Sequence, residues 1–153
     1  ALGYRLGYTE GVMVHALKQI PAIKSPATIK QVLTQELADA VTKAARSRQI
    51  LPEHLTADAP MRLYAALIDG EVVGWVRSIV CRGGSWVSNM EVQPDFRRQK
   101  IASALLVKMM RDDRKQGIKA STLTSSKAGA KLYTTLGYQP LGTLLLFTPL
   151  KEP

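Results

Sequence analysis

Hydrophobic positions recur with a helical period in the second half of the stretch 85–117. They stand at i, i+3, i+4, i+7 and i+8 and so share one helix face: Ala102, Leu105, Leu106, Met109 and Met110. The stretch 85–92 alternates instead like a β-strand, which places Trp86, Ser88, Met90 and Val92 on one side. Pro94 keeps the preceding residue out of the α-helical region. The pattern therefore predicts a strand, a short loop and a helix that Gly117 caps.

Further strands and a helix are expected before this unit. Residues 62–68 and 71–80 flank Asp69-Gly70, a dipeptide typical of tight hairpin turns, and Gly83-Gly84 predicts a second turn. Three consecutive antiparallel strands therefore lead into the loop. A first strand is expected near 12–17, with a helix as the alternative. Ser25-Pro26 predicts the start of a helix, which either continues to Arg48 or is followed by a second one, because apolar residues follow at helical spacing: Ile29, Val32, Leu33 and Leu37.

The chain after Gly117 predicts a strand at 118–124, a helix capped by Ser126 and ended by Gly137, and a last strand at 143–147. A strand, a helix and a strand in succession imply a right-handed crossover with parallel pairing. The predicted fold class is α/β (α+β), in one domain over residues 1–153. Its mixed central sheet has N-terminal antiparallel strands and a β-α-β crossover, with helices on both faces.

Composition narrows the class of protein. The 153 residues are enough for a core without metals or disulfides, and the single Cys81 excludes an internal disulfide framework and fits a reducing compartment. No apolar run approaches the roughly 20 residues that span a bilayer, and the N-terminus lacks a signal peptide's apolar core, so a cytoplasmic protein without membrane association is expected. His15 has no histidine or cysteine nearby in sequence, and no metal site is predicted.

The net charge of +9 raises nucleic acid as a partner. The cations are scattered along the chain, however, and no helix-turn-helix, zinc-finger or aromatic RNA-binding motif accompanies them. No nucleic-acid partner is therefore expected. A basic surface also suits a polyanionic small molecule such as coenzyme A.

Three of these cations crowd the predicted helix start, at Arg97, Arg98 and Lys100. The helix dipole and the free N–H groups already create positive potential there, so each cation costs a few tenths to about 1 kcal/mol unless an anion is bound. Free N–H groups beside arginines are suited to a phosphate or pyrophosphate. The alternative is that the three cations are simply solvated.

The residues Val92-x-Pro94-x-x-Arg97-Arg98-Gln99-Lys100-Ile101-Ala102 resemble motif A of the GNAT superfamily of acyl-CoA-dependent N-acetyltransferases, whose core is Arg/Gln-x-x-Gly-x-Gly/Ala. Lys100 stands where the family usually has glycine. Either the missing glycine hinders close approach to the pyrophosphate, or the lysine ammonium itself reaches a phosphate. Residues 126–138, with Ser126, Gly129, Tyr133 and Gly137, resemble motif B of the same superfamily.

This resemblance implies acetyl-CoA as co-substrate. Backbone groups of two strand residues would hold the pantetheine arm, and the N–H groups of the loop and first helical turn would surround the pyrophosphate. The cofactor-binding residues expected on this basis are Met90, Val92, Arg97, Arg98, Gln99, Lys100, Ile101, Ala102 and Ser103.

Two residues are candidates for catalysis. Tyr133 matches the family's frequent general acid, and a tyrosine with an ordinary pKa of about 10 stays protonated at neutral pH. Its spacing fits a tyrosine packed on the apolar helix face equally well. Glu91 points away from Met90 and Val92 and is the candidate base, acting through water, or else a solvated strand residue.

The sequence thus predicts an N-acetyltransferase that passes the acetyl group of acetyl-CoA to a primary amine of a small molecule or peptide by direct attack in a ternary complex. The alternative is a CoA-binding regulatory module with little or no turnover, which the lysine at position 100 motivates. The identity of the acceptor and the oligomeric state stay open, with a homodimer as one candidate.

Overall fold

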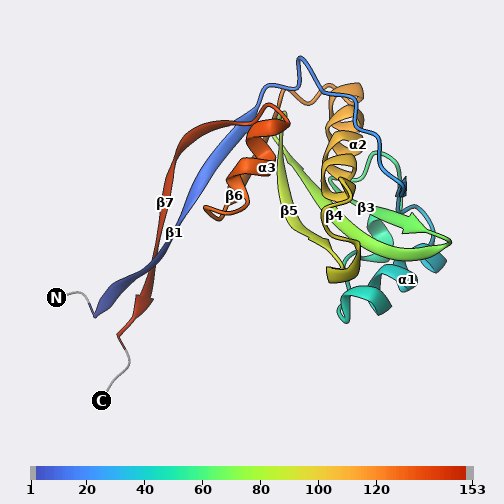
Figure 1. Ribbon diagram of the computed structural model, residues 1–153, viewed down its shortest axis with the longest axis horizontal. Helices are drawn as coiled ribbons and strands as arrows, with labels where there is room; N and C mark the ends of the chain where they lie inside the picture. The colour runs from blue at the N-terminus through green and yellow to red at the C-terminus, as the bar shows by residue number, and fades with distance from the viewer. Residues whose placement is uncertain (1–2, 151–153) are drawn as a thin grey trace.

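A seven-stranded sheet organises the computed structural model, which describes residues 3–150. The strand order is β2-β3-β4-β5-β6-β1-β7, and every neighbouring pair is antiparallel except β5 and β6 (Figure 1). The elements are β1 (Tyr4–His15), β2 (Thr28–Gln31), α1 (Gln35–Ala45), the short 3-10 helix η1 (Pro52–His54), β3 (Met61–Ile68), β4 (Glu71–Cys81), β5 (Gly84–Val92), the 3-10 helix η2 (Pro94–Phe96), α2 (Ile101–Lys115), β6 (Ala120–Ser125), α3 (Ala130–Thr135) and β7 (Gln139–Pro149).

The predicted hairpins are present. Asp69 and Gly70 both have positive φ, 50° and 83°, as the tight turn between β3 and β4 requires. The second turn consists of Arg82 and Gly83, one residue earlier than the predicted Gly83-Gly84, because Gly84 already pairs with Cys81 as the first residue of β5. Strand β5, α2 and β6 form the predicted crossover with parallel pairing.

The prediction of a helix that starts at Ser25-Pro26 is wrong. This segment is extended and contains β2, which pairs with β3 at the sheet edge, and the helix begins only after Thr34, whose Oγ1 accepts a hydrogen bond from the Leu37 N–H. Ile29 packs against the core under α2, whereas Val32 is buried in the core under α1. The two apolar residues therefore pack on opposite faces of the sheet. Their spacing in the sequence is also that of residues on one helix face, so the spacing alone does not distinguish the two structures.

Strands β1 and β7 are both longer than predicted, at 12 and 11 residues. Strand β1 lies between β6 and β7 and is antiparallel to both. The outer parts of β1 and β7 run away from the rest of the sheet as a two-stranded ribbon, which has the start of β1 and the end of β7 at its far end (Figure 1). The ribbon joins the two ends of the chain, a pairing that no local pattern indicates.

Apolar side chains form one core on each face of the sheet. The larger lies under α2 and α3 and includes Tyr64, Leu105 and Leu136. The smaller lies under α1 and includes Leu63 and Trp75. The prediction of a mixed sheet with helices on both faces is confirmed. Among residues 3–150, no helix combines the length and the apolar character needed to cross a membrane.

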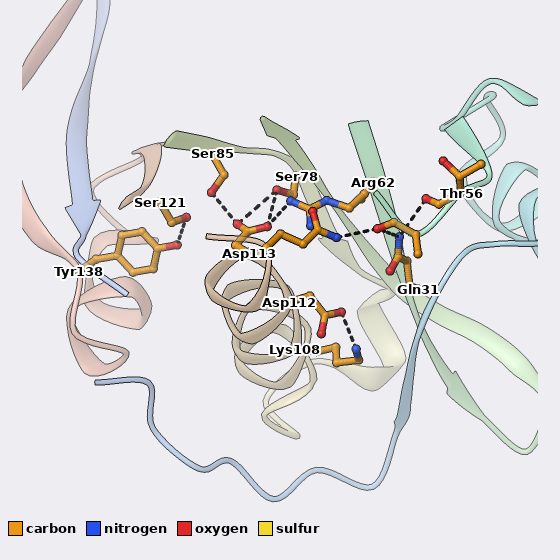
Figure 2. Close-up of polar contacts among 12 residues, drawn as sticks. Gln31, Thr56, Arg62, Ser78, Ser85, Lys108, Asp112, Asp113, Ser121 and Tyr138 are labelled. Carbon is orange, nitrogen blue, oxygen red and sulfur yellow. Dashed lines mark hydrogen bonds and ion pairs between the residues drawn. The ribbon is translucent and has the colours of Figure 1, made fainter. Parts of the chain in front are cut away.

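A buried polar network ties α2 to three strands (Figure 2). The Asp113 carboxylate, near the end of α2, accepts hydrogen bonds from Arg62 Nη2 at 2.5 Å, Ser85 Oγ at 2.6 Å and Ser78 Oγ at 3.1 Å. Arg62 and Asp113 are fully buried. Burial raises the pKa of the Asp113 carboxyl, and the hydrogen bonds from Ser85 and Ser78 and the charge of Arg62 oppose that rise. The network fixes α2 relative to β3, β4 and β5.

Substituting Asp113→Ala leaves the Arg62 guanidinium buried without its carboxylate, so we expect the free energy of unfolding to fall by about 3–5 kcal/mol. Urea unfolding followed by circular dichroism measures this. Lys108→Ala is the control, because it breaks a partly exposed ion pair between residues four apart on the same helix, Lys108 and Asp112, and should cost about 0.5 kcal/mol. A loss at Asp113 no larger than that of the control contradicts the assigned role.

Candidate active site

Strands β5 and β6 separate after a short parallel contact. They pair only from Gly84 to Trp86 on β5 and from Ala120 to Thr122 on β6, although both strands continue for several residues. The separation opens a cleft of about 350 Å³. Its lining comes from β5, β6 and α3 and consists of Trp86, Val87, Ser88, Asn89, Met90, Leu123, Thr124 and Tyr133.

A β-bulge at Asn89 changes the facing of β5 within this cleft. Ser88 pairs with Arg77 and Glu91 pairs with Trp75, so β5 has one residue more than β4 between these pairs, and Asn89 has a left-handed φ of 49°. The expectation that Trp86, Ser88, Met90 and Val92 share one side is therefore wrong. Val92 is buried under α2 and Met90 packs against the same core, whereas Trp86 and Ser88 lie on the opposite face.

The loop after β5 presents a run of free backbone amides. The N–H groups from Arg98 to Ser103 donate no hydrogen bond to any residue between 3 and 150, and α2 begins without a side-chain cap or an acidic residue in its first turn. Arg98 and Lys100 have left-handed φ values of 64° and 61°. Such a curled backbone at a helix start is suited to binding a phosphate or another anion.

The side chains of this loop have different surroundings. The Arg97 Nε donates a hydrogen bond to the Val92 carbonyl at 3.0 Å and so ties the loop to the end of β5. Arg98, Gln99 and Lys100 are exposed to solvent. Ile101 and Ser103 are buried, Ile101 in the core under α2, so the free amides that lie in exposed residues are those of Arg98, Gln99 and Lys100.

At position 100 the backbone adopts a conformation that glycine favours. Its φ of 61° is left-handed, a conformation that costs a residue with a side chain about 1 kcal/mol or more relative to glycine. Lys100 therefore adopts a conformation that glycine would take without this cost, and the residue is exposed to solvent.

Tyr133 lines the cleft from α3. Its ring packs edge-on against Tyr138, with ring centroids 5.9 Å apart, and the Tyr138 hydroxyl is hydrogen-bonded to Ser121 Oγ at 2.8 Å. No hydrogen bond within residues 3–150 engages the Tyr133 hydroxyl, and burial raises its pKa above the ordinary value. The hydroxyl therefore stays protonated at neutral pH and can donate a proton in the cleft.

Glu91 lies elsewhere. It is exposed, and it pairs across the sheet with Trp75, which belongs to the core under α1. It is not among the residues that line the cleft. The fold thus brings Met90 and Tyr133 together at the cleft, and β5 continues from the cleft into the loop that contains the free amides, while Glu91 is on the α1 face of β5.

Several cleft residues were not predicted. Trp86, Ser88 and Asn89 on β5 and Leu123 and Thr124 on β6 line the opening. The available signal was Asn89, since asparagine tolerates the left-handed conformation that such a bulge uses. The two residues of β6 carry no local signal, because they line the cleft only through the separation of two strands distant in sequence.

In this region the positive charge lies on the loop, and the cleft is uncharged. Arg97, Arg98 and Lys100 concentrate positive charge beside the free amides, whereas no charged residue lines the cleft.

A larger hollow of about 610 Å³ lies between α1 and the β3–β4 hairpin, but it lacks a run of free amides and a proton donor such as Tyr133. Within residues 3–150, no three His, Cys, Asp or Glu side chains gather closely enough to bind a metal.

Solved structures share this fold at low sequence identity. A GCN5-related N-acetyltransferase from Sphaerobacter thermophilus superposes with a TM-score of 0.73 at 24% identity, covering 98% of this chain and 54% of that one. One from Kribbella flavida gives 0.73 at 20% identity, covering 96% and 60%. An aminoglycoside acetyltransferase from an uncultured soil metagenomic sample gives 0.57 at 19%, covering 72% and 90%.

The chain thus spans a little over half of the length of the first two structures. No curated protein matches the chain. The acetyltransferase (GNAT) domain family matches residues 59–140, more than half of the chain and the part that holds β5, the loop, α2 and Tyr133. The chain therefore belongs to the GNAT acetyltransferase family.

Proposed function

We propose that this protein is an N-acetyltransferase that transfers the acetyl group of acetyl-CoA to a primary amine of a small molecule or peptide. The observation that carries the proposal is the juxtaposition of two features at the end of β5. The free amides from Arg98 to Ser103 suit a diphosphate, and the neutral cleft beside them contains the protonated hydroxyl of Tyr133.

The residues present fit such a cofactor. The free amides of the exposed loop residues, together with the Arg98 guanidinium, would hold the diphosphate, and the backbone of Met90 and Val92 would hold the pantetheine arm where β5 has left β6. Arg97 would act indirectly, because its Nε is already bonded to the Val92 carbonyl and keeps the loop in place.

When bound, acetyl-CoA supplies the thioester that the amine attacks. The cleft holds the two reactants together, which removes much of the entropic barrier to forming the C–N bond. As the C–S bond breaks, Tyr133 gives its proton to the departing thiolate. The proton lost by the amine passes to water, and Glu91 is the proposed base that receives it through a water chain from the other face of β5.

The lining of the cleft does not restrict the acceptor to one charge class. The cleft has no charged lining residue to pair with an anionic or cationic acceptor, while Trp86 offers an aromatic surface at its edge. One solved relative by fold is an aminoglycoside acetyltransferase, so aminoglycosides belong in a test panel beside polyamines and peptide amines.

Isothermal titration calorimetry with acetyl-CoA tests the proposal directly. We expect saturable binding that weakens with salt, because the diphosphate meets cationic side chains and free amides. Absence of binding at millimolar cofactor rules the proposal out. Binding without thiol release across the amine panel favours the CoA-binding regulatory module over the enzyme.

Substituting Tyr133→Phe removes the proton donor and keeps the ring packed on Tyr138. We expect kcat to fall by about 10²-fold or more while the KM for acetyl-CoA changes little, since the hydroxyl acts on the leaving group. Because burial raises the pKa of Tyr133 above that of an ordinary tyrosine, the acid stays protonated at neutral and mildly alkaline pH, and no loss of rate in that range should depend on this residue. Thiol release followed against pH measures both; an unchanged kcat contradicts the assignment.

Substituting Lys100→Gly relieves the left-handed strain, and we expect the free energy of unfolding to rise by about 1 kcal/mol. Lys100→Ala is the matched variant, because it removes the ammonium and retains the strained backbone. Urea unfolding of both variants measures the effect of strain, and acetyl-CoA titration of both measures the effect of charge. Equal stability of the two variants shows that the loop is unstrained at this position.

A further inference from the structure

Arg77 of β4 faces the α1 side of the sheet. Its two neighbours on the strand face the other side, because Val76 is buried in the core under α2 and the Ser78 hydroxyl is bonded to Asp113 of α2. Side chains alternate along a strand, so Arg77 lies on the same face as Trp75, which belongs to the core under α1. The Arg77 guanidinium is therefore separated by the sheet from the Asp113 carboxylate.

On that face Arg77 lacks an anionic partner. Its Nη2 donates a hydrogen bond to Ser88 Oγ at 3.4 Å, which is long for an N–H···O bond. Its Nε is buried and donates to no residue between 3 and 150. In this part of the chain the cations that form ion pairs are Arg62 and Lys108. A half-buried guanidinium thus keeps most of its donors free, and a bound anion would compensate its desolvation.

Arg77 stands directly beside the cleft. It pairs across the sheet with Ser88, and the next pair on the same face is Ile79 with Trp86. Ser88 and Trp86 both line the cleft. The Ile79 and Trp86 side chains are 38% and 39% exposed, so they form an apolar surface open to solvent. One face of the cleft entrance therefore combines a free cation with an aromatic and an aliphatic side chain.

This face is also the side from which an acceptor can enter. Tyr133 lines the cleft and packs against the core under α2 and α3, so the proton donor lies on the opposite side of the sheet. The leaving sulfur has to be near Tyr133, and the attacking amine then comes from the side of Trp86 and Ser88. Glu91, the proposed base, lies on this α1 face as well.

We propose that Arg77 binds a carboxylate of the acceptor, and that the acceptor is an amino acid with an apolar or aromatic side chain. A guanidinium matches the planar shape and the single charge of a carboxylate, which accepts two parallel hydrogen bonds from it. The surface of Ile79 and Trp86 would hold the apolar side chain. Glu91 follows one residue pair further, roughly 7 Å along the strands, and its charge is opposite to that of an ammonium group. The inference rests on the proposed acetyl transfer and specifies its acceptor.

Matched pairs of acceptors test the proposal. Phenylalanine, leucine and tryptophan are each compared with the amino alcohol that has a hydroxymethyl group in place of the carboxylate. Thiol release at saturating acetyl-CoA gives kcat/KM for both members of each pair. We expect the amino acid to be preferred by at least about tenfold in one pair or more, because the alcohol leaves the guanidinium unpaired.

Substituting Arg77→Met removes the charge and keeps a side chain of similar length. We expect the preference to disappear, while kcat/KM for the amino alcohols and the Kd of acetyl-CoA change by less than about twofold. Arg77→Lys should retain part of the preference, because an ammonium lacks the planar fork of donors. Arg82→Met is the matched control, since the exposed Arg82 belongs to the turn of the same hairpin. It should prefer the amino acids as the unmodified protein does.

A binding measurement does not depend on turnover. In nitrogen-15 spectra, the Nε–H signal of Arg77 is the one that Arg77→Lys removes. We expect this signal to shift when phenylalanine, leucine or tryptophan is added to the CoA-saturated protein, and to stay in place with the amino alcohols. A shift in a protein that releases no thiol with any amine would support the carboxylate site and contradict the proposed acetyl transfer.

Three outcomes overturn the assignment of Arg77. The first is acetylation of amines with equal kcat/KM for the acid and the alcohol in every pair, and the second is a preference that survives Arg77→Met. The third is an Nε–H signal that none of the three amino acids moves. The first two leave the proposed acetyl transfer intact, because each of them requires a working enzyme.

Discussion

The short contact between β5 and β6 is the constraint on which the site depends. Three residue pairs join the strands there, and side chains reinforce the joint: Thr122 Oγ1 donates to the Ser85 carbonyl at 2.9 Å, and Ser85 Oγ donates to the buried Asp113. On β6, the Ser121 hydroxyl is bonded to Tyr138, whose ring packs against Tyr133. The residues that close one end of the strand pair therefore also hold α2 and the cleft tyrosine in position.

Everything that suits acyl transfer lies where this contact ends. Beyond it, the bulge at Asn89 turns β5, and the loop after Val92 runs into α2 with its amides free. The cost of this arrangement is visible in the backbone, because Arg98 and Lys100 occupy left-handed conformations that glycine adopts more easily. The Asp113 network fixes the far end of α2 to β3 and β5.

Strand β6 also connects the site to the rest of the sheet. Its other edge pairs with β1, which begins near the start of the chain and continues into the ribbon with β7. The cleft and the ribbon are thus separate parts of one sheet with different chemistry. Positive charge gathers at the loop, where it suits the binding of an anion, and the ribbon is almost free of charge.

The sequence by itself determined the elements whose signals are local. The period of Leu105 to Met110 identified α2, Asp69-Gly70 identified a hairpin, and the spacing of Arg97 to Ala102 and of Ser126 to Tyr138 identified the family. Tertiary structure decided what depends on distant partners. Pairing with β3 made residues 28–31 a strand, the extra residue at Asn89 moved Met90 and Val92 to the other face, and pairing of the chain ends made the ribbon. The reason is physical: hydrophobic period and turn chemistry act within a few residues, whereas sheet order and register depend on hydrogen bonds between segments up to about the whole chain apart.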